Sequence, residues 1–239
     1  IFTTTQATTS DSLYKDRDPL YKVALQVLAD YQYAAANVRV NDGAYQVNKN
    51  VVLAYMTRDL LYLGTLMKYH NKDGAGAVTA CLNGCKWAAE QLMTSGKYAV
   101  TDDYRAVFTS EDLTNNKDVI FSRCYADGKA THCTVSYSNG YESQSPSASQ
   151  KMLNSYLCSD GFPIGQSPQY NYASDNNIRL YEDQVKNRDP RLLSTYRAEP
   201  VVKGWAAGAA TATGIFAWKY LPYTANDVEN KYFGSMNIT

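Results

Sequence analysis

Apolar side chains recur at intervals of three and four residues in three stretches of the first hundred positions, which is the period of an α-helix. The pattern predicts helices over residues 19–38, 49–70 and 76–94. An Asn-Asp-Gly run at 41–43 and an Asn-Lys-Asp-Gly run at 71–74 are typical of the turns that follow helices. The residues expected to face inward are, in chain order, Leu20, Val23, Val27, Tyr31, Ala34, Val52, Met56, Leu60, Leu63, Met67, Val78, Cys81, Leu82, Cys85, Ala89 and Leu92.

Small residues occupy the expected contact between the second and third predicted helices, at Gly64, Ala77 and Gly84. Because a short turn joins these helices, we expect them to pack as an antiparallel pair. Close approach over small side chains is typical of a tetratricopeptide unit, and an ordinary helical hairpin is the alternative. The pattern alone does not choose between the two.

The pattern changes beyond residue 95, where short apolar runs such as 119–121 alternate with clusters of Gly, Ser, Asn and Asp. Such alternation predicts loops with brief strands. A helix is expected near 147–158 and another from Asp189. The Ile-Phe-Ala-Trp run at 215–218 fits either a buried strand or a loop that presents its tryptophan.

The composition limits the classes of partner. Lys and Arg together number 23, as do Asp and Glu, so the formal net charge is zero and no basic stripe is present for a nucleic-acid backbone. The chain has 21 Tyr against 6 Phe and 3 Trp. Tyrosine offers a flat apolar face and a hydroxyl group, which suits sugar stacking and wet interfaces as well as packing between helices.

No catalytic arrangement is evident. The two histidines, His70 and His132, lie in no pattern that suggests a catalytic triad, and the usual metal, phosphate and dinucleotide motifs are missing from the sequence. A glycosidase needs two carboxylates that face each other across a cleft, so adjacent acidic residues are expected to be solvated loop charges. These pairs are Asp102–Asp103, Glu111–Asp112 and Glu182–Asp183. We expect a protein that is not an enzyme and needs no cofactor.

Five cysteines occur in the chain. Cys81 and Cys85 lie four apart on one helical face, where they suit small buried hydrophobes better than a disulfide. Cys124 and Cys133 flank an Asp-Gly turn and are the candidate pair for a disulfide in an oxidising compartment, with free thiols as the alternative. Together with His132 they are too few ligands for a zinc site.

Two segments carry a family resemblance. The first is Asn-Ser-Tyr-Leu-Cys-Ser-Asp-Gly-Phe-Pro-Ile at 154–164, and the second is Asn-Arg-Asp-Pro-Arg-Leu at 187–192. In this order and spacing they resemble the paired signature of the SusD/RagB family, surface lipoproteins with which Bacteroidetes-type bacteria capture nutrients. Further segments resemble helices, and the residues that follow helices, in that family; they are 18–34, 51–69, 88–98, 104–108 and 118–122.

The resemblance implies a mainly α, SusD-like fold: a tetratricopeptide-like helical scaffold with long irregular loops and a few short strands. Residues 1–95 would be the scaffold, and residues 96–239 a loop-rich, ligand-presenting region of the same domain. Family members extend further at both ends, so the resemblance also implies that this chain is a fragment, without the N-terminal lipidated leader and the C-terminal helices.

The implied function is non-enzymatic binding of an oligosaccharide or polysaccharide at the surface of the outer membrane. The glycan would be delivered to a SusC-like TonB-dependent transporter, and the only link to the membrane would be an N-terminal lipid anchor outside this chain. A glycan-active enzyme and a peptide-binding relative of the same family are the alternatives.

Candidate ligand residues are the aromatic residues of the later loops, although no family motif assigns them. They are Trp205, Tyr141, Tyr137, Tyr170, Tyr172 and Trp218. The signature residues Arg188, Asp189, Pro190 and Arg191 are expected to hold the fold and not to contact ligand. Asp189 suits a helix N-cap, and Pro190 suits the first helical position because its missing N–H would have no partner there.

The predicted disulfide can be tested by counting thiols under denaturing, non-reducing conditions. A bond between Cys124 and Cys133 leaves three free thiols out of the five cysteines. Closing this short loop stabilises the fold by about 3 kcal/mol in the chain-entropy model. Five reactive thiols in protein prepared from an oxidising compartment would exclude the bond.

Overall fold

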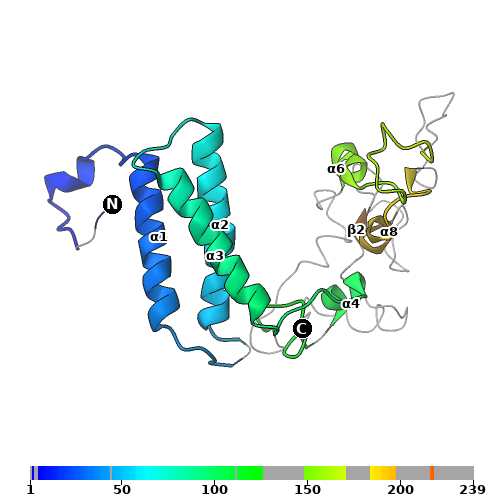
Figure 1. The fold of residues 1–239 in the computed structure, drawn as a ribbon, viewed down its shortest axis with the longest axis horizontal. Coiled ribbons are helices and arrows are strands. Elements are labelled where there is room, and N and C mark those ends of the chain that lie inside the picture. The colour runs from blue at the N-terminus through cyan, green and yellow to red at the C-terminus, as the bar shows by residue number, and fades with distance from the viewer. Residues whose placement is uncertain are drawn as a thin grey trace. The chain divides into compact units, whose positions relative to one another are not determined.

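The computed structural model is mainly helical, as the sequence predicts (Figure 1). The residues that it describes are 2, 5–43, 45–110, 112–125, 148–170, 184–197 and the backbone of 216–217. The chain forms two compact units. The first comprises Ile1–Val100 and Thr114–Arg123, and the second comprises Thr101–Leu113 and Cys124–Thr239. The sequence did not indicate that residues 114–123 return to the first unit.

The first unit contains three long helices after a short 3-10 helix, η1, at Asp11–Tyr14. They are α1 (Leu20–Asn37), α2 (Lys49–Tyr69) and α3 (Ala77–Thr94). These bounds confirm the three helices that the apolar period predicts. The side chain of Asn48 caps α2 by accepting hydrogen bonds from the backbone N–H groups of Asn50 and Val51.

Two glycines set the packing of the helices. A Cβ atom on Gly64 of α2 would lie 2.8 Å from a methyl group of Leu82, and one on Gly84 of α3 would lie 2.9 Å from a methyl group of Leu60. The order of these contacts runs in opposite directions along the two helices, so α2 and α3 are antiparallel, as predicted. Gly84 also approaches Leu28 of α1, whose methyl group would lie 2.8 Å from an added Cβ. All three helices therefore meet around this glycine.

The core of the first unit lies between the three helices. Met56, Leu60 and Met67 of α2 are fully buried, as the sequence predicts, and Cys81 of α3 is buried with them. Cys85 is only half-buried, and burial raises the pKa of both thiols. Several other predicted positions, Leu63 among them, are also only half-buried.

The prediction for α1 is confirmed in part, because most of the residues predicted to face inward pack against the core but are not its most buried ones. Its most buried side chains are Ala24, Leu28 and Ala35, whereas Val27 and Ala34 and the other residues predicted to face inward are half-buried. The physical reason is that α1 packs against both α2 and α3. Of its three buried residues Ala24 and Ala35 are small, and Leu28 lies against Gly84 of α3.

Tyr31 links α1 to α2, because its phenol donates a hydrogen bond to the carboxylate of Asp59. Burial, followed by this hydrogen bond, raises the pKa of Tyr31 to about 12. Arg58 donates to the other oxygen of the same carboxylate over 3.1 Å. The three side chains form a hydrogen-bonded group at the edge of the helical core.

The second unit is built from shorter elements. These are α4 (Tyr104–Thr109), α6 (Gln150–Ser155), α8 (Pro190–Thr195), β1 (Tyr196–Arg197) and β2 (Phe216–Ala217). The two strands pair antiparallel, with Tyr196 opposite Ala217. Leu153 of α6 and Leu192 of α8 form a small core with Ala148. Irregular backbone outweighs regular structure among the described residues beyond 95, as predicted.

Several local predictions for this part need correction. The helix predicted over 147–158 extends only over Gln150–Ser155, because Ser149 caps its start and Tyr156 returns to extended backbone. Residues 119–121 are not a strand, since the backbone there has no paired neighbour. The strand alternative for 215–218 is confirmed at Phe216–Ala217. The sequence analysis did not predict α4, whose start is capped by Asp103.

The buried line of α2 gives a matched test. Leu60→Ala should lower the free energy of unfolding by about 2–5 kcal/mol, because it leaves a cavity among three helices. Leu61→Ala is the control, since Leu61 is 49% exposed and its truncation should change stability by less than about 0.5 kcal/mol. Urea denaturation followed by circular dichroism measures both. Equal losses at the two positions would contradict the assignment of this core.

Candidate functional site

The two segments that carry the family resemblance, 154–164 and 187–192, are bonded to each other. The guanidinium of Arg188 is buried and donates hydrogen bonds to three backbone carbonyls. These carbonyls belong to Gln184 (2.9 Å), Leu153 (2.6 Å) and Tyr156 (2.8 Å). Arg188 therefore fixes the end of α6 to the segment that leads into α8.

Backbone pairing reinforces this junction. Cys158 and Arg188 form an isolated antiparallel bridge, flanked by hydrogen bonds from Ser159 N to Asn187 O (2.8 Å) and from Asp189 N to Leu157 O (3.0 Å). Asn187 has a positive φ of 55°, a conformation that asparagine tolerates better than most residues.

The Asp-Gly turn at 160–161 is stabilised by hydrogen bonds from residues that follow closely in the sequence. The carboxylate of Asp160 accepts hydrogen bonds from the hydroxyl of Ser167 (2.6 Å) and from the backbone N–H of Phe162 (3.0 Å). These bonds, the one from Ser167 first, lower the pKa of Asp160 below its usual value. Gly161 has a φ of 84°, which few other residues adopt.

Asp189 is the N-cap of α8 and Pro190 is its first residue, which confirms the predicted helix start. The Asp189 carboxylate accepts a hydrogen bond from the backbone N–H of Arg191 (2.9 Å). It also accepts from the Arg191 side chain, whose Nε lies 2.9 Å and 3.1 Å from the two carboxylate oxygens and whose Nη2 reaches Oδ2. The side-chain bond from Arg191 is the main reason why the pKa of Asp189 is lowered.

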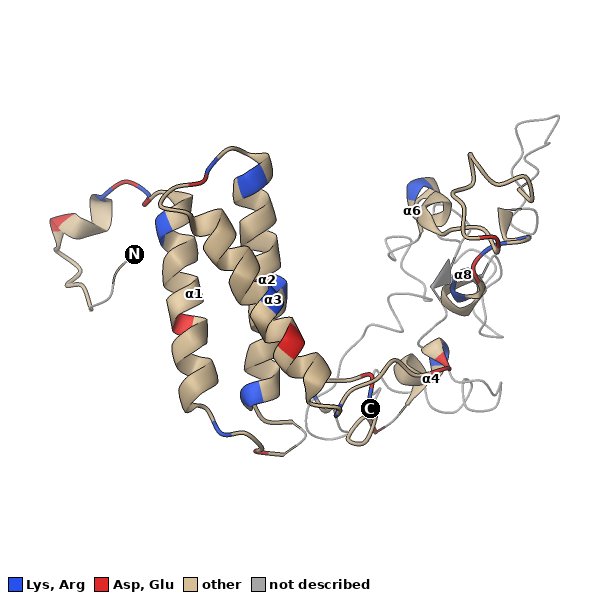
Figure 2. Ribbon diagram, viewed as in Figure 1, with Lys and Arg blue, Asp and Glu red and all other residues tan. Residues whose placement is uncertain are grey.

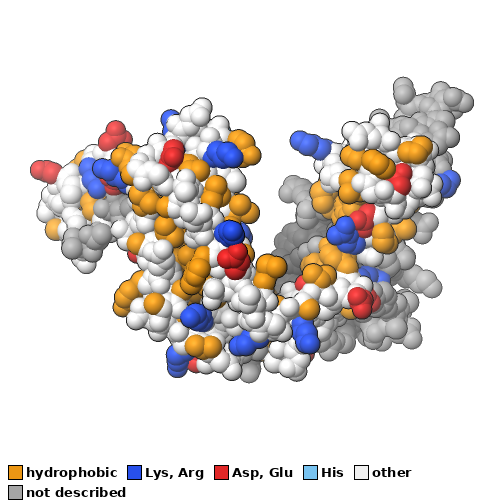
Figure 3. All heavy atoms as spheres, viewed as in Figure 1, with side chains coloured by type: hydrophobic (Ala, Val, Ile, Leu, Met, Phe, Trp, Pro, Cys, Tyr) orange, Lys and Arg blue, Asp and Glu red, His pale blue; other side chains and the backbone are white. Residues whose placement is uncertain are grey.

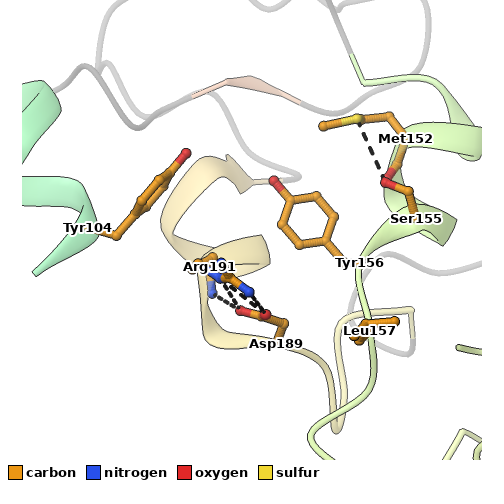
Figure 4. A pocket seen from close by; sticks show the side chains of 7 residues that line it. All are labelled: Tyr104, Met152, Ser155, Tyr156, Leu157, Asp189 and Arg191. Carbon is orange, nitrogen blue, oxygen red and sulfur yellow. Dashed lines mark hydrogen bonds and ion pairs between the residues drawn. The ribbon is translucent and has the colours of Figure 1, made fainter. Parts of the chain in front are cut away.

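A pocket of about 280 Å³ lies beside this ion pair, within the second unit (Figure 4). Tyr104 comes from α4, Met152 and Ser155 from α6, and Tyr156 and Leu157 from the segment that follows α6. Asp189 and Arg191 complete the lining. In the view of Figure 4 the rings of Tyr104 and Tyr156 stand on either side of the Arg191 guanidinium.

Neighbouring side chains hold both rings. Tyr104 makes an edge-to-face contact with Phe108, with ring centroids 5.0 Å apart. Tyr156 makes a similar contact with Tyr196 at 6.4 Å, and its hydroxyl is 3.4 Å from the hydroxyl of Thr195. The pocket thus combines two positioned aromatic rings, the apolar side chains of Met152 and Leu157, and a guanidinium that can donate hydrogen bonds.

The chemistry of this lining suits binding. It has no histidine, cysteine or lysine, and its one carboxylate is engaged by Arg191. Across the part of the chain that the structure describes, no three His, Cys, Asp or Glu side chains gather as metal ligands. Within the same residues, no helix has both the length and the apolar character needed to cross a membrane.

The structure describes one of the six predicted ligand aromatics. Tyr170 is half-buried and is not part of the pocket lining, and the Arg188 guanidinium lies 5.2 Å from the centre of its ring. The other five, Trp205, Tyr141, Tyr137, Tyr172 and Trp218, lie outside the described residues. Cys124 is exposed with a free thiol, and Cys133 lies outside the described residues, so their disulfide stays a prediction.

Two aromatic residues that line the pocket, Tyr104 and Tyr156, were not among the predicted ligand residues. The signal for them in the sequence is their position inside the family-like segments at 104–108 and 154–164. Arg191 was predicted, together with Arg188, to be a structural residue. The structure distinguishes them, because Arg188 is buried whereas the Arg191 side chain is 64% exposed and lines the pocket.

The first unit carries a second set of aromatic side chains. Tyr55, Tyr62 and Tyr69 are exposed and recur every seven residues along α2, which places them on one face of the helix. Hydrophobic side chains reach the surface along these helices (Figure 3). Basic and acidic residues are interspersed along the same helices (Figure 2).

Comparison with known proteins finds no matching family model, no similar curated protein and no similar solved structure. The resemblance to the SusD/RagB family therefore depends on the motifs of this sequence, and any function must be argued from the site itself.

The two arginines of the signature give a matched stability test. Arg188→Gln should lower the free energy of unfolding of the second unit by about 3 kcal/mol, because buried carbonyls lose a charged donor. Arg191→Gln should cost less than about 1 kcal/mol, since its side chain is largely exposed. Hydrogen exchange of the peptides that contain residues 153–157 and 189–195 measures the local effect. Similar protection in both variants would contradict a structural role for Arg188.

Asp189 predicts a pH dependence. Its pKa is lower in the folded protein than the value near 4 expected in the unfolded chain. Its charge therefore stabilises the fold above about pH 4, and this contribution is lost as the pH falls through the lower folded pKa. Asp189→Asn keeps a capping side chain but removes the titration. The difference in unfolding free energy between wild type and variant should narrow below pH 4; a constant difference would contradict the assignment.

Proposed function

We propose that this protein binds an oligosaccharide reversibly, without turnover, in the pocket lined by Tyr104, Tyr156 and the Arg191–Asp189 pair. The observation that carries the proposal is the combination of two held tyrosine rings with a guanidinium beside them. Sugar rings have apolar faces that stack on aromatic side chains, and their hydroxyl oxygens accept hydrogen bonds from arginine.

The volume of the pocket agrees with a small ligand segment. At about 280 Å³ it lies just below the range for small-molecule sites, which begins at about 300 Å³. A short stretch of a longer glycan would fit such a site, with the rest of the chain outside it.

A glycan-active enzyme is the less favoured alternative. Glycosidases use a pair of carboxylates about 5–10 Å apart, one of which keeps a raised pKa. The lining contains a single carboxylate, that of Asp189, whose pKa is lowered and whose oxygens both accept bonds from Arg191. This arrangement disfavours proton transfer to a glycosidic oxygen.

The wider proposal is that the chain is part of a SusD/RagB-type capture protein at the cell surface, which delivers glycan to a TonB-dependent transporter of the outer membrane. The paired signature supports it, because its halves lie together around Arg188. In this proposal α2 and α3 correspond to a tetratricopeptide-like unit, a view supported by their close contact at Gly64 and Gly84. A peptide-binding member of the same family is the second candidate within this class.

Calorimetry with Tyr104 variants tests the pocket. Tyr104→Ala should weaken glycan binding about fivefold, since one stacked ring contributes about 1 kcal/mol. Tyr104→Phe should retain most of the affinity because it keeps the ring. Tyr62→Ala is the control, since Tyr62 is an exposed tyrosine of the first unit outside the pocket.

Three outcomes would contradict the proposal. Release of reducing sugar at catalytic rates would make the protein an enzyme. Binding of peptides with no response to any glycan would change the ligand class. Unchanged glycan affinity in Tyr104→Ala would move the site away from this pocket.

A further inference from the structure

The charges of the pocket are balanced by its own lining. Arg191 and Asp189 are the only charged residues among the seven that line it, and they are bonded to each other. The formal charges of the lining therefore sum to zero, although the Arg191–Asp189 pair makes one side of the pocket polar.

The local backbone fixes this neutralisation. Asp189 is held as the N-cap of α8 by its bond from the Arg191 N–H, and its own N–H donates to Leu157 O. Pro190, between Asp189 and Arg191, is the first residue of the helix. The Asp189 side chain is only 16% exposed, so a ligand meets chiefly the guanidinium while the carboxylate lies behind it.

The guanidinium keeps donors for a ligand. Arginine has five side-chain N–H groups, of which the bonds to Asp189 use those on Nε and one side of Nη2. The donors on Nη1 and the second one on Nη2 can bond to hydroxyl or ring oxygens. An anionic group would gain less here, because Asp189 already compensates the positive charge and would repel a second carboxylate.

We propose that this pocket selects neutral sugars over uronic acids and sulfated sugars, with Asp189 as the residue that determines this specificity. The inference rests on the proposed glycan binding and deepens it by naming the substrate class. Asp189 acts by neutralising Arg191, which leaves a donor of hydrogen bonds without a free positive charge.

The test uses paired oligosaccharides that differ only in the acid group: gluco-, galacto- and manno-oligomers, and the corresponding uronic acid oligomers. Wild-type protein should bind a neutral member at least about tenfold more tightly than its acidic counterpart. The affinity for the neutral member should change little between about 0.05 and 0.5 M salt, because salt has no net charge to screen in the pocket.

Asp189→Asn should shift the preference toward the acidic counterpart by about tenfold, since it frees the Arg191 charge for a charge-assisted bond. Asparagine caps helices about as well as aspartate, so the helix start is retained, which circular dichroism verifies. Adding Arg191→Gln to the Asp189→Asn variant should abolish this gain in affinity for the acidic counterpart. Asp59→Asn is the matched control, because it removes a carboxylate paired with Arg58 in the first unit and should leave selectivity unchanged.

Tighter wild-type binding of the acidic members would overturn this inference and leave glycan binding intact. Unchanged selectivity in a folded Asp189→Asn protein would do the same. If wild-type protein binds no member of either series, the proposed function fails and this inference falls with it. The wild-type comparison needs no variant, so it decides the question even if Asp189→Asn does not fold.

Discussion

The junction of α6 and α8 depends on the buried guanidinium of Arg188. A guanidinium removed from water is stable only where acceptors replace its lost hydration. Arg188 finds these acceptors in backbone carbonyls at the end of α6 and before α8, two places some thirty residues apart in sequence. The carbonyl of Leu153, in the last turn of α6, also accepts a hydrogen bond from the backbone N–H of Tyr156. The Nη1 and Nη2 groups of Arg188 thus link the end of α6 to the segment before α8, while its buried Nε has no hydrogen-bond partner among the described residues.

The side chains of the short segment around Arg188 lie in different environments. Arg188 is directed inward, Asp189 caps the helix, and Arg191 lies one step further on, at the surface beside the pocket. The two arginines differ in what they bond to: Arg188 donates to backbone carbonyls, whereas Arg191 pairs with the carboxylate of Asp189.

The first unit is stabilised mainly by apolar packing. Three helices bury a continuous apolar core, and glycines at 64 and 84 bring the backbones close enough to exclude water. Polar contacts such as that between Tyr31 and Asp59 fix the orientation of α1 at the edge. This unit keeps tyrosines exposed along α2, whereas the pocket tyrosines of the second unit are held by aromatic neighbours.

The sequence by itself determined the three long helices of the first unit, the antiparallel pairing of α2 and α3, and the helix start at Asp189. Each follows from local rules: the period of apolar residues, a short turn, and the cap chemistry of an aspartate before a proline. Only the tertiary structure decided which face of α1 is buried, because that depends on two neighbouring helices at once. It alone separated Arg188 from Arg191 and brought Tyr104 beside Tyr156, since these residues lie far apart in the chain. Contacts across such distances depend on how the loops fold back, and no periodicity or spacing in the sequence encodes them directly.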